Sequence, residues 1–586
     1  MDAARPQVSP GQWGRSATLR ARPQSAIAPL LIASPALVFL AVFFAWPLIE
    51  IARVSFTPSE ISRGATPLTV LRDPAHLRAL GFSAGQAALS TALTLLAGIP
   101  IALAFARYRF AGQRLWRALA VAPFVMPTVV VAAAFSALLG PRGALNSALQ
   151  TAFGLEQPPI QLMGTLPMIL LAHVFYNVAV VLRLVGGFLA AFDPSMEEAA
   201  AGLGANRWQT FRHVTLPVAM PSVGAAAALT FLFTFTSFGV VLILGGARFA
   251  TLEVEIYRQT AQLLRLDVAT SLAIVQIVVT LLVGWASARL ETRAGAPLAA
   301  RPADDIRRPV NSPAARALVA GSLAFIILVL GLPLATLAWR SLDLSGSDPL
   351  RYYAALSENP RGSLFFVPPQ TAIRNSLFFA GATATLAMLL GVPLSYAIAQ
   401  GSRSAAGGAA RLAQSLDALL LLPLGTSAAT LGLGFLVAFD RPPLELRTSV
   451  ALLPLAHTLI ALPFVARALV PAIRALDPRL REAARGLGAG PLQALRYVDL
   501  PLLAPPFIAA AIFAFTVSLG EFGASLLIAR PEYPTMPMVI YRFLGQPGAL
   551  NYGQALAMST LMMLVTLVSV IAIERVNEQA LSARKA

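Results

Sequence analysis

The chain places a few polar side chains inside long apolar segments, where each one costs free energy. Glu521 lies in the run Ser-Leu-Gly-Glu-Phe-Gly, and an ionised carboxylate at the centre of a bilayer costs at least about 2.5–3.5 kcal/mol. It therefore needs a polar partner or a hydrated cavity. Ser237 stands 284 positions earlier, followed by Phe238 as Glu521 is followed by Phe522. These groups could contact a cationic solute; a structural acid satisfied by an arginine or a backbone group is the alternative.

Two histidines, His173 and His457, also lie in apolar segments and are separated by the same 284 positions. Histidines on different helices could bind a metal ion or a haem, but the chain has only four histidines and no cysteine. We therefore expect interhelical hydrogen bonds and predict no metal site. The residues predicted to line a pathway through the apolar segments are His173, Ser237, Phe238, His457, Glu521 and Phe522.

The composition excludes several kinds of chemistry. Without cysteine, the chain can form no disulfide, iron–sulfur cluster or thiol nucleophile. Its only lysine is Lys585, whereas a phosphate-binding P-loop needs a lysine before Ser or Thr. We therefore expect no ATP site and no cofactor in this chain, and its low fraction of charged residues argues against a soluble enzyme, so we expect no enzyme activity. Any ATP and Mg²⁺ that drive it would be bound by partner subunits.

The elements that position these side chains are predicted to be transmembrane helices. The 586 residues are 57% hydrophobic and 12% charged, which is about half the charged fraction of a soluble domain. A helix crosses the bilayer core with roughly 20 apolar residues, so we predict an all-α polytopic membrane protein with about twelve spans. They are 27–49, 81–105, 118–139, 165–189, 219–244 and 268–288, followed by 316–339, 373–399, 416–439, 449–471, 503–528 and 553–573.

The spans are predicted to form two parallel six-helix repeats. Residues 198–217 and 482–501 are identical at 12 of 20 positions without a gap, which indicates a duplication. Six spans separate equivalent points, so both halves have the same orientation, with a pathway between them. The predicted domains are an N-terminal tail (1–26), a first half (27–289), a linker (290–315), a second half (316–575) and a C-terminal tail (576–586).

The net charge of +17 would suggest nucleic acid binding in a soluble protein. Here the arginines concentrate in short connections on one side of the predicted spans. Arg107, Arg109, Arg114 and Arg117 form the most compact group. The positive-inside rule makes that side cytoplasmic. We therefore predict that both termini are cytoplasmic, that the partner of this charge is the lipid bilayer, and that no nucleic acid is bound.

Two loops on the predicted cytoplasmic side share one pattern, 193–217 and 477–501, and we call them the paired loops. Each begins with Asp-Pro, which is suited to start a helix, and a Gly-Leu-Gly run then allows a turn with positive φ. A second amphipathic piece ends at Leu-Pro, which should break the helix before the next span. The alternative is that these are interfacial helices that only rest on the lipid head groups. The occurrence of the same loop twice, at a fixed spacing, argues against this alternative.

The order Glu-Ala-Ala, Gly and a downstream Leu-Pro resembles the EAA motif of type I ABC importer permeases. The resemblance implies that each paired loop is a coupling helix that docks on an ATPase subunit, two copies of which complete the complex. It also implies a periplasmic or lipid-anchored substrate-binding protein and a bacterial inner (plasma) membrane. The residues that carry the motif are Glu198, Ala199, Ala200, Gly202 and Gly204, and Glu482, Ala483, Ala484, Gly486 and Gly488.

The form with two fused halves is similar to the thiamine and iron(III) permeases of that superfamily. Residues 169–183, 236–257 and 518–541 are similar to the thiamine member, although Glu521 stands where aspartate is expected. The similarity implies thiamine import, with iron(III) as the alternative.

Two hypotheses of another class remain. An ion-coupled secondary transporter would need several intramembrane acids, and a haem-bearing respiratory subunit would use the histidines.

Overall fold

A computed structural model describes residues 27–57, 65–192, 195–246, 248–293, 307–344, 348–358, 368–402 and 408–583. Within these ranges the chain is helical apart from connections and one pairing of two short strands. Eleven of the described helices are long and apolar enough to cross a membrane, so the all-α polytopic fold is confirmed. The predicted tail 1–26, half of the linker (294–306), and Asp193-Pro194 of the first paired loop lie outside the described residues.

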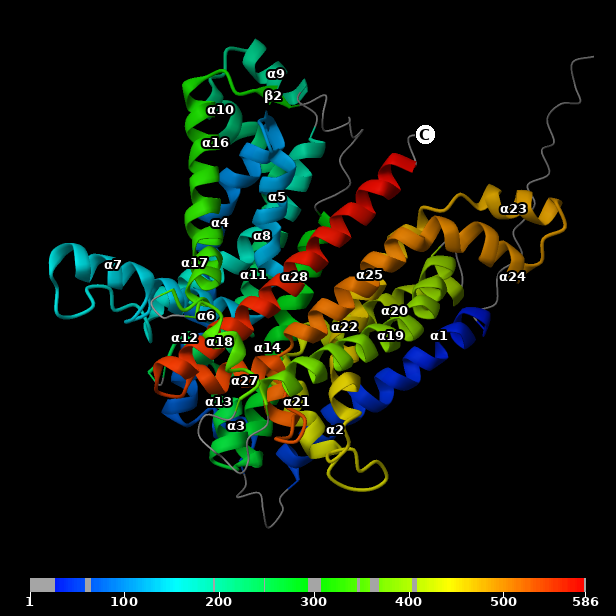
Figure 1. Cartoon of the computed structure of the whole chain (residues 1–586). Helices are drawn as coiled ribbons and strands as arrows, with labels where there is room; N and C mark the ends of the chain where they lie inside the picture. Colours follow the sequence, from blue (N-terminus) through cyan, green and yellow to red (C-terminus); the bar gives the residue numbers. More distant parts are fainter. Residues whose placement is uncertain are drawn as a thin grey trace, which may run out of the picture.

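The elements follow one another in a similar order in the two halves (Figure 1). The first half contains α1 (Ile27–Leu40), η1 (Ala41–Ala45), α2 (Trp46–Phe56), α3 (Pro67–Val70), α4 (Pro74–Arg107), β1 (Tyr108–Arg109), α5 (Gln113–Val121), η2 (Ala122–Val125), α6 (Thr128–Leu139), α7 (Ala144–Phe153), α8 (Leu166–Ala191), α9 (Ser195–Gly202), α10 (Arg207–Thr210), η3 (Phe211–Thr215), α11 (Leu216–Phe235), α12 (Gly239–Leu244), α13 (Leu252–Tyr257), η4 (Arg258–Gln262) and α14 (Leu266–Arg293).

The rest of the chain contains β2 (Arg308–Pro309), α16 (Pro313–Phe325), η5 (Ile326–Gly331), α17 (Leu332–Arg340), α18 (Arg351–Ala354), α19 (Pro369–Gly401), α20 (Gly408–Gly425), α21 (Ala428–Ala438), α22 (Leu452–Arg474), α23 (Pro478–Gly486), α24 (Pro491–Ala494), η6 (Leu495–Asp499), α25 (Leu500–Gly520), α26 (Gly523–Ile528), α27 (Met536–Leu544) and α28 (Ala549–Ala583). Helices α14 and α28 continue past the predicted ends of their spans. The paired loops, with α9 and α10 in one and α23 and α24 in the other, lie on the same side of the molecule (Figure 1).

Four of the predicted spans are interrupted, at corresponding places in the two halves. Segment 118–139 is divided into α5, η2 and α6, and segment 416–439 into α20 and α21. Segments 219–244 and 503–528 end early and resume as the short helices α12 and α26. The prediction of continuous helices was wrong here, because an apolar run does not show where its backbone hydrogen bonds stop. The division at α21, an apolar helix shorter than a span, explains why eleven spans are found among the described residues instead of twelve.

The Leu-Pro pair at the end of each paired loop does not break the helix, contrary to prediction. Helices α10, η3 and α11 form one run from Arg207 to Phe235, and α24, η6 and α25 form another to Gly520. Both η3 and η6 are single π-helical turns directly before the Leu-Pro pair. Proline lacks the N–H that would continue the α-helical pattern, and a π turn accommodates such a defect inside a helix. Each paired loop is therefore joined directly to a span.

The first span of each half packs on the other half. Helix α1 packs on α19, and α2 packs on α21; the rings of Phe43 and Trp46 lie 5.4 and 5.5 Å from that of Phe439. In the same way α16 packs on α4, and α17 on α6. Strand β2, just before α16, pairs in parallel with β1, with Tyr108 opposite Arg308. The two halves are therefore interlocked.

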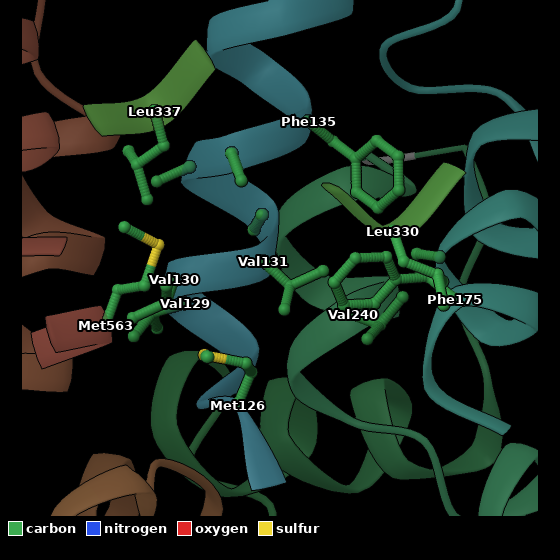
Figure 2. Packing of buried hydrophobic residues seen from close by; sticks show 14 of the residues in the cluster. Met126, Val129, Val130, Val131, Phe135, Phe175, Val240, Leu330, Leu337 and Met563 are labelled. Carbon is green, nitrogen blue, oxygen red and sulfur yellow. The ribbon is translucent and has the colours of Figure 1, made fainter. Parts of the chain in front are cut away.

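Helix α6 lies in the largest buried apolar cluster, between the two halves. It packs against α17 and α28 of the second half and against α8 and α12 of the first. The ring centroids of Phe135 and Phe175 are 5.5 Å apart. Figure 2 shows residues of this cluster: Met126, Val129, Val130, Val131, Phe135, Phe175, Val240, Leu330, Leu337 and Met563. Helix α6, which follows the interruption at η2, is therefore packed against both halves.

One glycine in each half allows two spans to cross closely. A Cβ added at Gly98 of α4 would lie 2.8 Å from the Cβ of Val181 on α8. A Cβ at Gly391 of α19 would lie 2.6 Å from Cγ1 of Val465 on α22. Small residues let transmembrane backbones approach, and the same contact occurs in both copies. This crossing is therefore part of the repeated scaffold.

We predict that Gly98→Val and Gly391→Val each destabilise the protein by about 1–3 kcal/mol, because the added side chain overpacks the crossing. The measurement is the temperature at which the detergent-purified protein loses its monodisperse elution peak. Gly85→Val is the matched control, since Gly85 lies in the same helix as Gly98 with no neighbouring atom within 4 Å of the added Cβ. Equal melting of all three variants would contradict the close crossing.

Candidate translocation site and paired loops

A cavity of about 370 Å³ lies between the two halves, where the spans are interrupted. Its walls come from η2, α6, α8, α11 and α12 of the first half and from α21, α22, α25 and α26 of the second. Five of the six predicted pathway residues line it, namely His173, Ser237, Phe238, Glu521 and Phe522. The sixth, His457, is buried and places Nε2 3.3 Å from Oε2 of Glu521. The structure therefore brings the six residues together.

A Phe-Gly pair follows the interruption in each half. Its glycine is required because the backbone there lies very close to side chains of neighbouring helices. A Cβ on Gly239 would lie 2.5 Å from Oγ1 of Thr128 and 3.1 Å from a ring carbon of Phe522. A Cβ on Gly523 would lie 2.9 Å from the Cβ of Ala428. Only glycine fits at both positions without displacing its neighbours. The two interruptions therefore place non-helical backbone, together with Ser237 and Glu521, at the wall of the cavity.

Glu521 is held by the helix that follows it. Its Oε1 accepts a hydrogen bond from the N–H of Ala524 at 2.8 Å. Its Oε2 accepts bonds from the N–H and the hydroxyl of Ser525, each at 2.9 Å. The carboxylate therefore caps the first turn of α26, as the structural alternative supposed, and among the described residues it also has two side-chain partners, the Ser525 hydroxyl and the His457 imidazole. It also lines the cavity, where it is 8% exposed, so its charge still acts on the interior.

Both histidines lie within hydrogen-bonding distance of hydroxyls on other elements. His173 is 2.9 Å from Oγ of Ser90 on α4 and 2.9 Å from Oγ of Ser237. His457 is 2.8 Å from Oγ of Ser518 and 2.9 Å from Oγ of Ser525. The predicted interhelical hydrogen bonds are confirmed. Each imidazole ties its span to the interrupted span beside the cavity.

Four aromatic rings join the two halves beside the cavity. Phe238 and Phe522 stack with ring centroids 5.9 Å apart and an angle of 24°. Tyr257 packs on Phe238 at 5.5 Å, and Tyr541 packs on Phe522 at 5.3 Å. The tyrosines were absent from the predicted site. Their separation by the same 284 positions was the signal that could have identified them.

The paired loops are built alike and expose the same residues. Helices α9 and α23 contain no buried residue, and they carry Glu198, Ala199 and Ala200 and their counterparts Glu482, Ala483 and Ala484. Gly202 and Gly486 end these helices. The predicted turn is confirmed, since Gly204 and Gly488 have φ of +86° and +85°. Between the glycines, Leu203 and Leu487 are 91% and 90% exposed.

The second loop begins as predicted, and both loops are braced at equivalent positions. The Asp477 side chain accepts a hydrogen bond from the N–H of Arg479, with proline at the first helical position. In the first loop, Oε1 of Glu197 lies 2.6 Å from the Thr215 hydroxyl and 2.5 Å from Nη2 of Arg107.

In the second loop an ion pair takes the place of the carboxylate–hydroxyl pair. Arg481 replaces Glu197 and Asp499 replaces Thr215, with Nε of the arginine 2.9 Å from Oδ1 of the aspartate. These hydrogen bonds raise the pKa of Arg481. The duplicated position therefore ties the loop helix to the start of the span in both halves, through different chemistry.

The comparisons with known proteins agree with this arrangement. The family model described as "Binding-protein-dependent transport system inner membrane component" matches residues 95–295 and 391–582. The chain belongs to this family. It is thus a multi-pass membrane protein and the permease subunit of an ABC importer, with two fused copies of the permease domain. Each matched segment contains one paired loop and one side of the cavity.

Relatives of this permease carry several names. It is 29% identical over 71% of its length to 73% of the "Probable ABC transporter permease protein y4fN" of Sinorhizobium fredii. It is 28% identical over 79% of its length to 83% of the thiamine transport system permease protein ThiP of Escherichia coli. It is 29% identical over 44% of its length to 90% of the putative 2-aminoethylphosphonate permease PhnU of Salmonella paratyphi A. The two relatives whose names give a substrate therefore differ in that substrate.

We predict that Glu521→Ala destabilises this permease by about 1–3 kcal/mol, since two buried backbone N–H groups lose their acceptor. The measurement is the melting temperature in detergent. Glu521→Gln is the matched control, because its amide oxygen can still accept one of these bonds, so we expect a smaller loss. If the alanine variant and the unaltered protein had the same melting temperature, the capping role of Glu521 would be refuted.

Proposed function

We propose that this permease imports thiamine into the bacterial cytoplasm, driven by two partner ATPase subunits that dock on the paired loops. The face that carries the loops is then cytoplasmic, as are both termini and the linker 290–315 between the halves 27–289 and 316–575. ATP and Mg²⁺ are bound by the partners and not by this chain. A periplasmic or lipid-anchored binding protein delivers the substrate to the opposite face.

The observation that carries the coupling role is the matched exposure of Leu203 and Leu487. Each leucine stands at the tip of a turn fixed by a glycine with positive φ. Burying a leucine contributes about 1.5–3 kcal/mol, so two such leucines on one face form a symmetric pair of contacts for two copies of a partner. The exposed Glu198 and Glu482 beside them provide charge at the same places.

The cavity favours a cation over an anion. Among the described residues that line it, Glu521 is the only carboxylate, and there is neither arginine nor lysine. Thiamine carries a positive charge on an aromatic ring, whereas a phosphonate would face the carboxylate without a compensating cation. This supports thiamine over the phosphonate named for the PhnU relative.

Iron(III), the alternative substrate, fits the cavity less well. Hard cations favour several oxygen ligands, and this wall offers one carboxylate that is already hydrogen-bonded. Among the described residues, no group of three or more His, Cys, Asp or Glu is placed to hold a metal ion. Thiamine is therefore the substrate that we propose.

The proposal is tested by reconstituting the permease with its ATPase and binding protein in proteoliposomes. We expect ATP-dependent accumulation of labelled thiamine and none of labelled 2-aminoethylphosphonate. Accumulation of the phosphonate, or of iron(III) alone, would refute the proposed substrate. Uptake that follows a proton or sodium gradient without ATP would refute the proposed mechanism.

We predict that the double variant Leu203→Asp with Leu487→Asp lowers ATP-dependent uptake by at least about tenfold, because charge replaces two apolar contacts. Co-purification of the ATPase with the permease should fall in parallel, while melting stays unchanged. The matched control is Leu68→Asp, on a residue that is 75% exposed on α3 at the opposite face. Normal uptake with normal co-purification would exclude these leucines from the docking contact.

A further inference from the structure

The two walls of the cavity differ chemically although the halves are repeats. On α8 the cavity is lined by His173, Tyr176 and Asn177. The positions equivalent to Tyr176 and Asn177 on α22 hold Ile460 and Ala461. One wall therefore carries hydrogen-bonding groups where its counterpart carries alkyl groups.

Tyr176 has a buried hydroxyl without a partner. Its Oη is shielded from solvent and makes no hydrogen bond with any described residue. The ring is held edge-on against Phe175, with centroids 5.6 Å apart at 84°. A buried polar group without a partner is unusual and calls for an explanation. Tyr176 also lines the cavity, so a small turn of its side chain would bring the hydroxyl to a solute inside, which can supply the missing partner.

The opposite wall is suited to a flat ring. Phe464 on α22 and Phe513 on α25 line it with ring centroids 5.3 Å apart, next to Ile460 and Val517. Aromatic faces stack on flat apolar groups and attract positive charge. The lone carboxylate of Glu521 lies on the same second-half side, where α25 ends.

We propose that the cavity binds a flat heteroaromatic cation in one orientation. The hydrogen-bonding edge of the solute faces Tyr176, its ring faces Phe464 and Phe513, and its positive charge lies toward Glu521. The volume of about 370 Å³ is within the range of small-ligand sites. This inference rests on the proposed function and adds to it a site at which the permease itself recognises the substrate.

The test combines a change in the protein with a change in the solute. Thiamine and an analogue without the exocyclic amino group of the pyrimidine are compared as uptake substrates of the complete reconstituted complex. For the unaltered permease we expect removal of the amino group to lower uptake about three- to tenfold, the effect of one hydrogen bond. Tyr176→Phe should lower thiamine uptake by a similar factor.

The decisive result is the combination of the two changes. If the hydroxyl and the amino group contact each other, Tyr176→Phe should take up the analogue as well as it takes up thiamine, because one interaction cannot be lost twice. Tyr533→Phe, on an exposed tyrosine outside the cavity, is the control and should behave as the unaltered permease.

The outcomes separate this inference from the proposed function. If the unaltered complex accumulates thiamine while Tyr176→Phe matches it for both solutes, the oriented site is refuted and the import function stands. If Tyr176→Phe and removal of the amino group lowered uptake by independent factors that multiply, a direct contact between the hydroxyl and the amino group would be refuted. Absence of thiamine uptake by the unaltered complex would overturn the proposed substrate and the site together.

Discussion

A helix that is interrupted within a membrane leaves backbone N–H and C=O groups that no water can satisfy, and the structure of this permease depends on how these groups are satisfied. At the start of α26 the Glu521 carboxylate accepts from Ala524 and Ser525. At the end of α11 the Thr236 hydroxyl donates to the carbonyl of Leu232. Because these interruptions are satisfied internally, irregular backbone can line a cavity at the centre of the spans.

The same interruptions mark the ends of the helices that lead to the paired loops. The segment from Trp208 to Phe235 has 28 residues and that from Leu492 to Gly520 has 29, so each extends roughly 40 Å at 1.5 Å per residue. A π turn keeps each helix continuous past its proline. One continuous helix therefore connects each paired loop with the wall where Ser237 or Glu521 lies.

Features encoded over short distances could be predicted from the sequence. Apolar runs located the spans, the duplicated motif located the paired loops, and the Gly-Leu-Gly run predicted the turn at Gly204 and Gly488. The interruptions and the exchange of α1 and α16 between halves were not predictable, because a helix that is apolar all round carries no information on its partner. Tyr257 and Tyr541 were missed because they lie outside the predicted spans, in connections whose position relative to the pathway the sequence does not give.

Fusion of the two halves permits what a symmetric pair of chains could not. In a homodimer each residue occurs on both sides of the axis, so a tyrosine on one wall would face a tyrosine on the other. Here the crossing at Gly98 and Gly391 is retained in both copies, while Tyr176 faces a wall that has isoleucine at the equivalent position. In the proposed mechanism two equal partners act on the symmetric scaffold and loop turns, whereas an asymmetric solute passes between the unlike walls of the cavity.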